Sequence, residues 1–267
     1  MTQRLLALAA ALLAALPLLL GCARAQGGVT VAGSTSVQPF AEALAEEYMR
    51  QHPSAVINVQ GGGSTAGIQA ALTGAAEIGM SSRELKPDEQ AQLVETVIAQ
   101  DAIAVVVHPS NPVGALSLEQ TRQIFSGQVT NWRAVGGPDK PIHAVTREEG
   151  SGTRGAFQEL VMGKSDINPG SIVQDSNGAV RQVVADDPNA IGYISLGLVN
   201  EQVKPVSVGK VPPTHENVVD GSYALKRPFL FVQKGPQSAA AESFIKYTLS
   251  PEGQQLLVSE GLVPAKK

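Results

Sequence analysis

The feature that most constrains the fold is a repeated unit. In each copy, an apolar strand-like run leads through a turn rich in Gly, Ser or Thr into a helix-like segment. The four turns are Gly33–Pro39, Gly61–Gly67, Ser81–Arg83 and Arg147–Arg154. Alternating strands and helices of this length predict parallel sheets with helices on their faces. Because ligands bind beyond the C-terminal ends of such strands, the four turns are expected to converge on one site.

The first part of the chain alternates clearly between the two kinds of segment. Strands are predicted at Val29–Ala32, Ala55–Val59, Glu77–Met80 and Ala102–Val107, and helices at Phe40–Arg50, Ile68–Ala75 and Lys86–Thr96. The run Ala102–Val107 has no polar alternation, which is typical of a strand buried on both faces. His108–Pro112 breaks this run, so the crossing from a first lobe to a second is predicted there.

The second part continues the pattern and then returns. Helices are predicted at Leu118–Phe125, Gly155–Met162, Ser176–Asp187 and, broken at Ser250–Pro251, Ser238–Gly261; strands are predicted at Pro141–Thr146, Ala190–Ile194, Val203–Val208 and Tyr223–Gln233. The strand Tyr223–Gln233 is expected to return to the first lobe. The predicted division is residues 27–106 with 223–267 as lobe 1 and residues 107–222 as lobe 2.

The turn at Arg147 has the chemistry of an anion site. A turn between a strand and a helix leaves several backbone N–H groups unpaired, and the helix dipole adds partial positive charge there. Ser151 and Thr153 add hydroxyl donors, and Arg147 adds a planar fork of N–H groups suited to a tetrahedral oxyanion. An ordinary capped helix start with a surface arginine would look similar. Repetition of polar turns upstream favours the anion site.

Composition and motif spacing exclude several classes of function. The formal net charge is -4 and aromatic residues make up 4% of the chain, which argues against nucleic acid as a partner. The Gly61–Gly67 turn lacks the Gly-Lys-Ser/Thr ending of a P-loop and the spacing of a dinucleotide fingerprint. The histidines at 52, 108, 143 and 215 show no metal-ligand spacing. Ser151 lacks the Gly-x-Ser-x-Gly context and partner base of a serine hydrolase.

Residues 1–22 are predicted to be an export signal outside the fold. The apolar run Leu5–Leu20 is short for a membrane span, and Leu19–Cys22 resembles a bacterial lipoprotein cleavage box. Cys22 is the only cysteine, so it cannot form an internal disulfide, and its lipidation would anchor the protein to a membrane. Ordinary signal cleavage at Ala23–Ala25 is the alternative. Both alternatives place the protein outside the cytoplasmic membrane, in the periplasm or on a lipid anchor.

Four motifs together carry a family resemblance. They are Gly33-Ser-Thr-Ser-Val-Gln-Pro39, Gly61-Gly-Gly-Ser-Thr-Ala-Gly67, Ile78-Gly-Met-Ser-Ser-Arg83 and Arg147-Glu-Glu-Gly-Ser-Gly-Thr153, in that order. The chain resembles the phosphate-binding proteins of high-affinity phosphate ABC importers, in their shorter branch, over essentially all of the mature chain. The resemblance implies an α/β, two-lobed periplasmic-binding-protein fold of type II. It has two mixed sheets flanked by helices and a hinge of two strands.

The resemblance also implies a ligand, a site and a partner. Dehydrated inorganic phosphate would be held between the lobes by hydrogen bonds, without a metal, cofactor or catalysis, and passed to an ABC permease by a monomeric protein. The expected phosphate-binding residues are Thr35, Ser36, Val37, Ser64, Ser82, Arg83, Arg147, Ser151, Gly152 and Thr153. Glu149 occupies the place of an acid that braces the arginine in the family.

One position departs from the family pattern and leaves an alternative open. Longer members can carry an aspartate, which accepts the proton of hydrogen phosphate, where this chain has Ser82. The acceptor that would distinguish phosphate from sulfate is therefore in question. The alternative functions are a binding protein for another oxyanion such as sulfate, and a sensor instead of a transport component.

Overall fold

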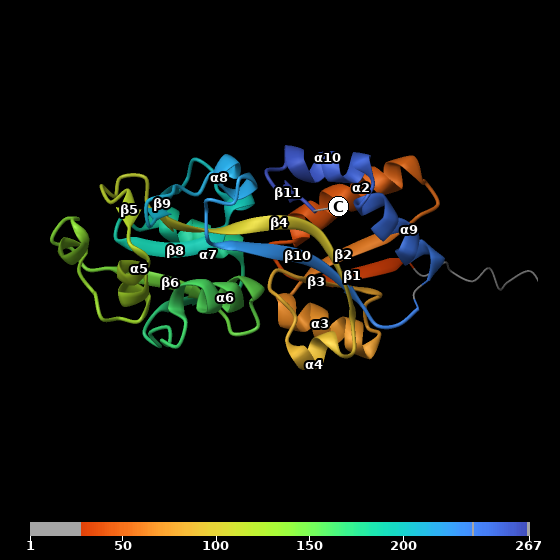
Figure 1. Ribbon diagram of the computed structural model, residues 1–267, viewed down its shortest axis with the longest axis horizontal. Coiled ribbons are helices and arrows are strands. Elements are labelled where there is room, and N and C mark those ends of the chain that lie inside the picture. The colour runs from red at the N-terminus through yellow and green to blue at the C-terminus, as the bar shows by residue number, and fades with distance from the viewer. Residues whose placement is uncertain (1–27, 237, 266–267) are drawn as a thin grey trace, which may run out of the picture.

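The computed structural model describes residues 28–236 and 238–265, and these form two lobes with a long strand running between them (Figure 1). Cys22 and the predicted export signal lie outside the described residues. The elements of lobe 1 are β1 (Val29–Gly33), α2 (Gln38–Gln51), β2 (Ile57–Gly61), α3 (Ser64–Thr73), β3 (Ile78–Ser81), α4 (Pro87–Gln90), β10 (Lys226–Gln233), α9 (Ala239–Thr248), α10 (Pro251–Ser259) and β11 (Val263–Pro264). Strand β4 (Val94–Val107) is shared by both lobes.

Lobe 2 is built from the middle of the chain. Its elements are β5 (Ala115–Leu116), α5 (Leu118–Phe125), the 3-10 turn Trp132–Val135, β6 (His143–Arg147), α6 (Gly152–Phe157), the π-helical turn Gln158–Met162, β7 (Ile172–Gln174), α7 (Asn177–Asp186), β8 (Ala190–Ser195), the 3-10 turn Leu196–Leu198, β9 (Lys204–Val208) and α8 (His215–Val219). The alternating strands and helices confirm the predicted α/β class, and the two lobes confirm the predicted architecture.

The two sheets have the same strand order. In lobe 1 the order is β2-β1-β3-β10-β4, with β1 parallel to β2 and β3 and with β10 antiparallel to its neighbours. In lobe 2 the order is β7-β6-β8-β4-β9, with β6 parallel to β7 and β8 and with β4 antiparallel to its neighbours. Both sheets are therefore mixed, and their parallel strands direct their C-terminal ends to equivalent places.

The lobes are joined by two neighbouring segments. Strand β4 pairs with β10 up to Ala102 and with β8 from Ile103 onward. The chain returns beside this point, where the Ile103 N–H donates to the carbonyl of Leu225 and the Tyr223 hydroxyl donates to the carbonyl of Ile103. We propose that the lobe boundary lies at this change of pairing partner, within β4, instead of at His108–Pro112.

One predicted helix is wrong. The segment Lys86–Thr96 was expected to be helical, but only Pro87–Gln90 is, and β4 has begun by Val94. The Glu- and Gln-rich start of the segment favours a helix locally. Pairing of residues 94–102 with β10 overrides that preference, because Val94, Thr96 and Val97 extend the apolar strand and suit a sheet.

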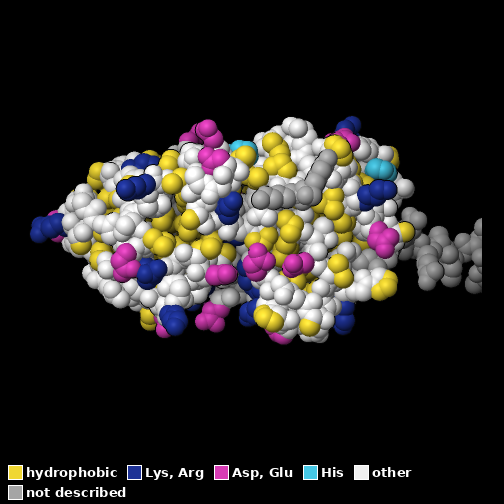
Figure 2. All heavy atoms as spheres, in the orientation of Figure 1, with side chains coloured by type: hydrophobic (Ala, Val, Ile, Leu, Met, Phe, Trp, Pro, Cys, Tyr) yellow, Lys and Arg dark blue, Asp and Glu magenta, His cyan; other side chains and the backbone are white. Residues whose placement is uncertain are grey.

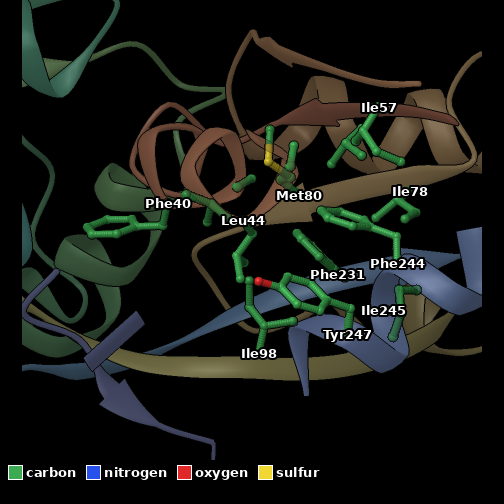
Figure 3. Close-up of a cluster of buried hydrophobic side chains, with 14 of the residues drawn as sticks. Phe40, Leu44, Ile57, Ile78, Met80, Ile98, Phe231, Phe244, Ile245 and Tyr247 are labelled. Carbon is green, nitrogen blue, oxygen red and sulfur yellow. The ribbon is translucent and has the colours of Figure 1, made fainter. Parts of the chain in front are cut away.

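Each lobe has its own apolar core. In lobe 1, Phe40, Leu44 and Tyr48 lie on one face of α2 and are buried in a core shared with β10 and the C-terminal helices; Figure 3 shows Phe40 and Leu44 of this face. In lobe 2, the ring of Phe157 stacks on that of Tyr193 at 3.9 Å. Trp132 is buried in the same core. The two cores hold the sheets rigid, so that the turns at the strand ends are well positioned.

Candidate anion-binding site

The four predicted turns meet between the lobes. The turn after β1 leads into α2, Ser64 is the first residue of α3 after β2, and Ser82 follows β3. From the other lobe, Gly152 begins α6 after β6. Helices α3 and α6 begin earlier than predicted, at Ser64 and Gly152 instead of Ile68 and Gly155, so the turn residues belong to their first turns. Unpaired N–H groups of such first turns favour anions.

A cluster of hydroxyl groups joins the turns. The hydroxyl cluster consists of Ser34, Ser36, Ser64, Ser82 and Thr153, and each of these residues is at most 2% exposed. Within lobe 1, the Ser34 hydroxyl donates to that of Ser82 at 2.9 Å, and the Ser64 and Ser82 hydroxyls are 3.4 Å apart. Across the lobes, the Ser36 and Thr153 hydroxyls are 3.4 Å apart. The lobes are therefore closed over a buried group of donors.

Ser34 is at the centre of this cluster, and sequence reasoning missed it. Its oxygen lies 3.0 Å from that of Ser36 and accepts the N–H groups of Ser36 and Val37 at 3.3 and 3.4 Å. The Val37 N–H also donates to the Ser34 carbonyl, so it already has partners within its own turn. The only signal for Ser34 in the sequence was its place in the Gly33–Pro39 turn. We infer that Ser34 orders the first turn against the third.

Arg147 is the buried positive charge of the site. Its side chain is 1% exposed, and its Nε and Nη2 atoms each donate to a different carboxylate oxygen of Glu148 at 2.9 Å. The same two nitrogens also contact the carbonyls of Gln174 and Asp175. Nη1 is buried and has no hydrogen-bond partner among residues 28–236 and 238–265. A buried charged donor without an acceptor is costly, so Nη1 is the nitrogen available to an anion.

The acid that braces Arg147 is not the expected one. Glu149 was expected in this role, but the ion pair forms with Glu148. A tight turn closes when the Ser151 N–H donates to the Glu148 carbonyl at 3.1 Å. That turn leaves Glu149 at its tip, where its side chain is exposed.

The hydroxyl of Tyr193 fixes the backbone of Arg147 by a hydrogen bond. This hydroxyl lies 2.6 Å from the Thr146 hydroxyl and accepts the Arg147 N–H at 3.4 Å. Burial raises the pKa of the Tyr193 phenol, so the phenol stays neutral and remains a hydrogen-bonding group. The stacking of this ring on Phe157 therefore links the core of lobe 2 to the position of its arginine.

The start of α6 approaches lobe 1 very closely. Ser151 caps the helix by accepting the Arg154 N–H at 3.2 Å. A Cβ at Gly152 would lie 2.1 Å from the Ser64 oxygen and 2.6 Å from the Ser82 oxygen, so only glycine fits. The Thr65 N–H also donates to the Gly150 carbonyl at 3.0 Å across the lobes. Gly152 is therefore the point where closure is tightest.

Arg83 has a partner of its own. Its Nη1 and Nη2 donate to the two oxygens of Glu89 at 2.7 and 2.9 Å. These bonds hold the pKa of the Glu89 carboxyl below its usual range. The Arg83 guanidinium is therefore directed at α4, and we propose that it supports the third turn without contacting the anion.

A second ion pair, which sequence reasoning did not find, lies beneath the hydroxyl cluster. Asp101 of β4 and Arg227 of β10 face each other across the two joining strands, and both are buried. The Arg227 Nε donates to Asp101 at 3.0 Å, and its Nη1 donates to the Ser82 carbonyl at 3.3 Å. The third turn is thereby tied to the segment that joins the lobes. Among residues 28–236 and 238–265, no group of His, Cys, Asp and Glu could hold a metal ion.

Comparison with known proteins gives consistent matches. The model of a PBP superfamily domain matches residues 21–252. The phosphate-binding protein PstS of Bacillus subtilis is 33% identical over 246 residues, which cover 90% of this chain and 82% of that protein. A solved structure of a putative phosphate ABC transporter substrate-binding protein with bound phosphate, from Clostridium perfringens, is 44% identical with a TM-score of 0.87; the match covers 90% of this chain and all of that one. The solved structure of an ABC-type phosphate transport receptor from Vibrio cholerae is 40% identical with a TM-score of 0.75. The match covers 89% of this chain and all of that one.

Proposed function

The chain belongs to the PstS family of phosphate-binding proteins, and on this premise we propose that it captures inorganic phosphate between its lobes and delivers it to an ABC permease. The observation that carries the proposal is the buried hydroxyl cluster beside an arginine whose Nη1 has no protein acceptor. Those groups are hydrogen-bond donors supplied from both lobes, as a dehydrated oxyanion requires.

The site balances the phosphate charge mainly with dipoles. The positive charges of Arg147 and Arg227 each have a carboxylate partner, so the ion pairs alone leave no net charge for the ligand. On the face of the molecule shown in Figure 2, basic and acidic side chains are likewise interspersed. Hydroxyl and backbone N–H donors in a buried site interact strongly with an anion, because little solvent screens them. Two lobes that each supply donors hold one anion fully only when closed.

We propose that the protein is not an enzyme. Ser151 uses its hydroxyl to cap α6, and in the described part of the chain no histidine contacts the hydroxyl cluster. A serine nucleophile needs a general base hydrogen-bonded to it. Turnover of a chromogenic phosphate or carboxylate ester would contradict this reading.

We propose that the protein works outside the cytoplasmic membrane as a monomer, attached by a lipid on Cys22. In the described residues, no helix is both long and apolar enough to cross a bilayer. The anchor proposal rests on the lipobox-like Leu19–Cys22 sequence, with signal cleavage near Ala25 as the alternative. A Cys22→Ala protein should leave the membrane fraction and become soluble. Persistence in the membrane would instead favour an uncleaved signal helix.

A second candidate ligand is sulfate, because the residue at position 82 is a serine and not a carboxylate. The ligand is tested by calorimetric titration of refolded, anion-stripped protein with phosphate and, separately, with sulfate. We expect one phosphate per chain and weaker binding of sulfate. Sulfate binding as tight as phosphate binding would assign the protein to a broader oxyanion function, and absence of phosphate binding would overturn the proposal.

A further inference from the structure

The hydroxyl of Thr35 receives two donors from the opposite lobe. Thr35 lies in the first turn of lobe 1, yet its Oγ1 accepts from Nη2 of Arg147 at 3.2 Å and from Nδ2 of Asn177 at 3.3 Å. Arg147 ends β6 and Asn177 begins α7, so both donors belong to lobe 2. The two lone pairs of a hydroxyl are filled by two such bonds.

Asn177 is held so that its donor faces Thr35. Its side chain is 1% exposed, and its Oδ1 accepts the N–H of Ser195 at 3.1 Å. The Ser195 bond comes from the end of β8, within the same lobe. Because an amide has one acceptor end and one donor end, the Ser195 bond leaves Nδ2 for the contact across the lobes.

The contact also bears on the orientation of Arg147. Its Nε and Nη2 atoms are occupied by Glu148, backbone carbonyls and Thr35, which leaves Nη1 as the nitrogen without a partner. Thr35 supplies the only one of these acceptors that comes from lobe 1. The guanidinium is therefore held in one plane by both lobes when they are closed.

We propose that Thr35 and Asn177 are positioning residues that hold the closed lobes and Arg147 in place, and that they slow the release of phosphate instead of binding it. This inference rests on the proposed phosphate function. The donors and the acceptor belong to different lobes, so the contact exists only in the closed form. Contacts of this kind stabilise the closed state without changing the first encounter with the ligand.

Release and capture can be measured separately. To measure release, protein loaded with radiolabelled phosphate is mixed with an excess of unlabelled phosphate, and the retained label is followed by rapid filtration. To measure capture, labelled phosphate is added to anion-stripped protein and the bound label is followed in the same way. Thr35→Val removes the hydroxyl and keeps the shape of the side chain. We expect it to release phosphate roughly 5- to 30-fold faster, which is less than the loss of two full hydrogen bonds would give, because Nη2 of Arg147 keeps Glu148 and Asp175 as acceptors. The capture rate should stay within about two-fold of wild type.

Three further variants separate a positioning role from other causes. Thr35→Ser keeps the acceptor oxygen and should restore slow release. Asn177→Ala should speed release less than Thr35→Val, and the double variant should be no faster than Thr35→Val, because Asn177 acts through Thr35. Thr73→Val, which removes an exposed hydroxyl bonded within α3, should leave both rates unchanged.

The outcomes are distinct. Wild-type protein that retains label, with Thr35→Val releasing it at the wild-type rate, would overturn the positioning role and leave the phosphate function intact. The positioning role would also be overturned if Thr35→Val captured phosphate more slowly but released it at the wild-type rate. It would be overturned as well if Thr35→Ser and Thr35→Val released phosphate equally fast. Wild-type protein that retains no phosphate would overturn the proposed function and this inference together.

Discussion

The two lobes share one strand order, yet they use their buried arginines in opposite ways. Arg83 of lobe 1 follows β3, and both of its terminal nitrogens donate to Glu89. Arg147 of lobe 2 ends β6 and also has a glutamate partner, but its Nη1 has no acceptor within the part of the chain that the structure describes. We infer that a buried arginine near a strand end can bind an anion only if one of its N–H donors is left over after its protein contacts are counted.

The two lobes also contribute different chemical groups to the candidate site. Lobe 1 contributes most of the hydroxyl cluster, four serines on two turns and a helix start, whereas lobe 2 contributes Thr153 and the charged group. Hydroxyls can rotate and adapt, whereas the guanidinium has a fixed plane. We infer that lobe 1 can receive the anion first and that lobe 2 completes its coordination when it closes.

The largest expected effect on phosphate affinity comes from Arg147. Arg147→Met removes the unpaired donor and leaves the Glu148 carboxylate without its partner, so phosphate binding should weaken roughly 100-fold or more. The double variant Arg147→Met/Glu148→Gln has no unpaired carboxylate, so calorimetry on it measures the effect of the lost donor alone. The matched control is Arg83→Met/Glu89→Gln, which likewise leaves no carboxylate without a partner and should bind phosphate within about three-fold of wild type. Equal losses in the two double variants would contradict the different roles of the two arginines.

The next effect concerns closure. Gly152→Ala places a methyl group where Ser64 and Ser82 already lie within 2.6 Å, so the lobes should not close fully. Phosphate affinity should fall by roughly ten- to thirty-fold with little change in thermal stability, because the clash exists only in the closed form. Gly178→Ala is the control, since nothing lies within 4 Å of the added methyl group. Small-angle scattering should show the compaction by phosphate in the control and less of it in Gly152→Ala.

A smaller effect concerns the choice between anions. Ser82→Asp introduces a carboxylate into the hydroxyl cluster, where it can accept the proton of hydrogen phosphate but faces only lone pairs of sulfate. The ratio of sulfate to phosphate dissociation constants should rise roughly ten-fold, in line with the cost of an unpaired buried polar group. Ser82→Asn has a similar size without the charge and should change the ratio much less. An equal change in both variants would locate the discriminating acceptor elsewhere.

The smallest effect on binding, but a clear one on stability, is expected at the Arg83 ion pair. Hydrogen bonds from Arg83 lower the pKa of the Glu89 carboxyl below its ordinary value of 4.5. The ionised pair therefore contributes stability above about pH 4.5, and that contribution is lost as the pH falls through the lowered pKa. Urea unfolding is measured at a series of pH values from 5 downward. The free energy of unfolding should fall further for wild type than for Arg83→Met/Glu89→Gln. Parallel losses in the two proteins would show that the pair adds nothing.

Much of this arrangement could be predicted from the sequence. Apolar runs followed by polar turns identify the strand ends, and parallel topology brings strand ends together. That reasoning correctly places Ser36, Ser64, Ser82, Arg147 and Thr153 between the lobes. These positions follow from the order of the strands and do not depend on the orientation of any single side chain.

The remaining details depend on the orientation of single side chains and on contacts between residues that are far apart in the sequence. Which of Ser34 and Thr35 joins the hydroxyl cluster is decided by the geometry of one turn, which the sequence does not give; the expected site residues included Thr35 and left out Ser34. The same limit applies to Glu148 and Glu149, which are neighbours in a turn. Asn177 meets Thr35 across 142 residues and two lobes, a contact that no local pattern indicates.

A high-resolution crystal structure of the wild-type protein with phosphate would show directly whether Nη1 of Arg147 binds the anion. We expect one phosphate between the lobes, with an oxygen within hydrogen-bonding distance of Nη1 of Arg147 and with hydroxyl donors from both lobes. Thr35 should keep its bonds to Arg147 and Asn177, and Arg83 should stay on Glu89. A phosphate bound to one lobe alone, or one that leaves Nη1 of Arg147 without an acceptor, would contradict the account.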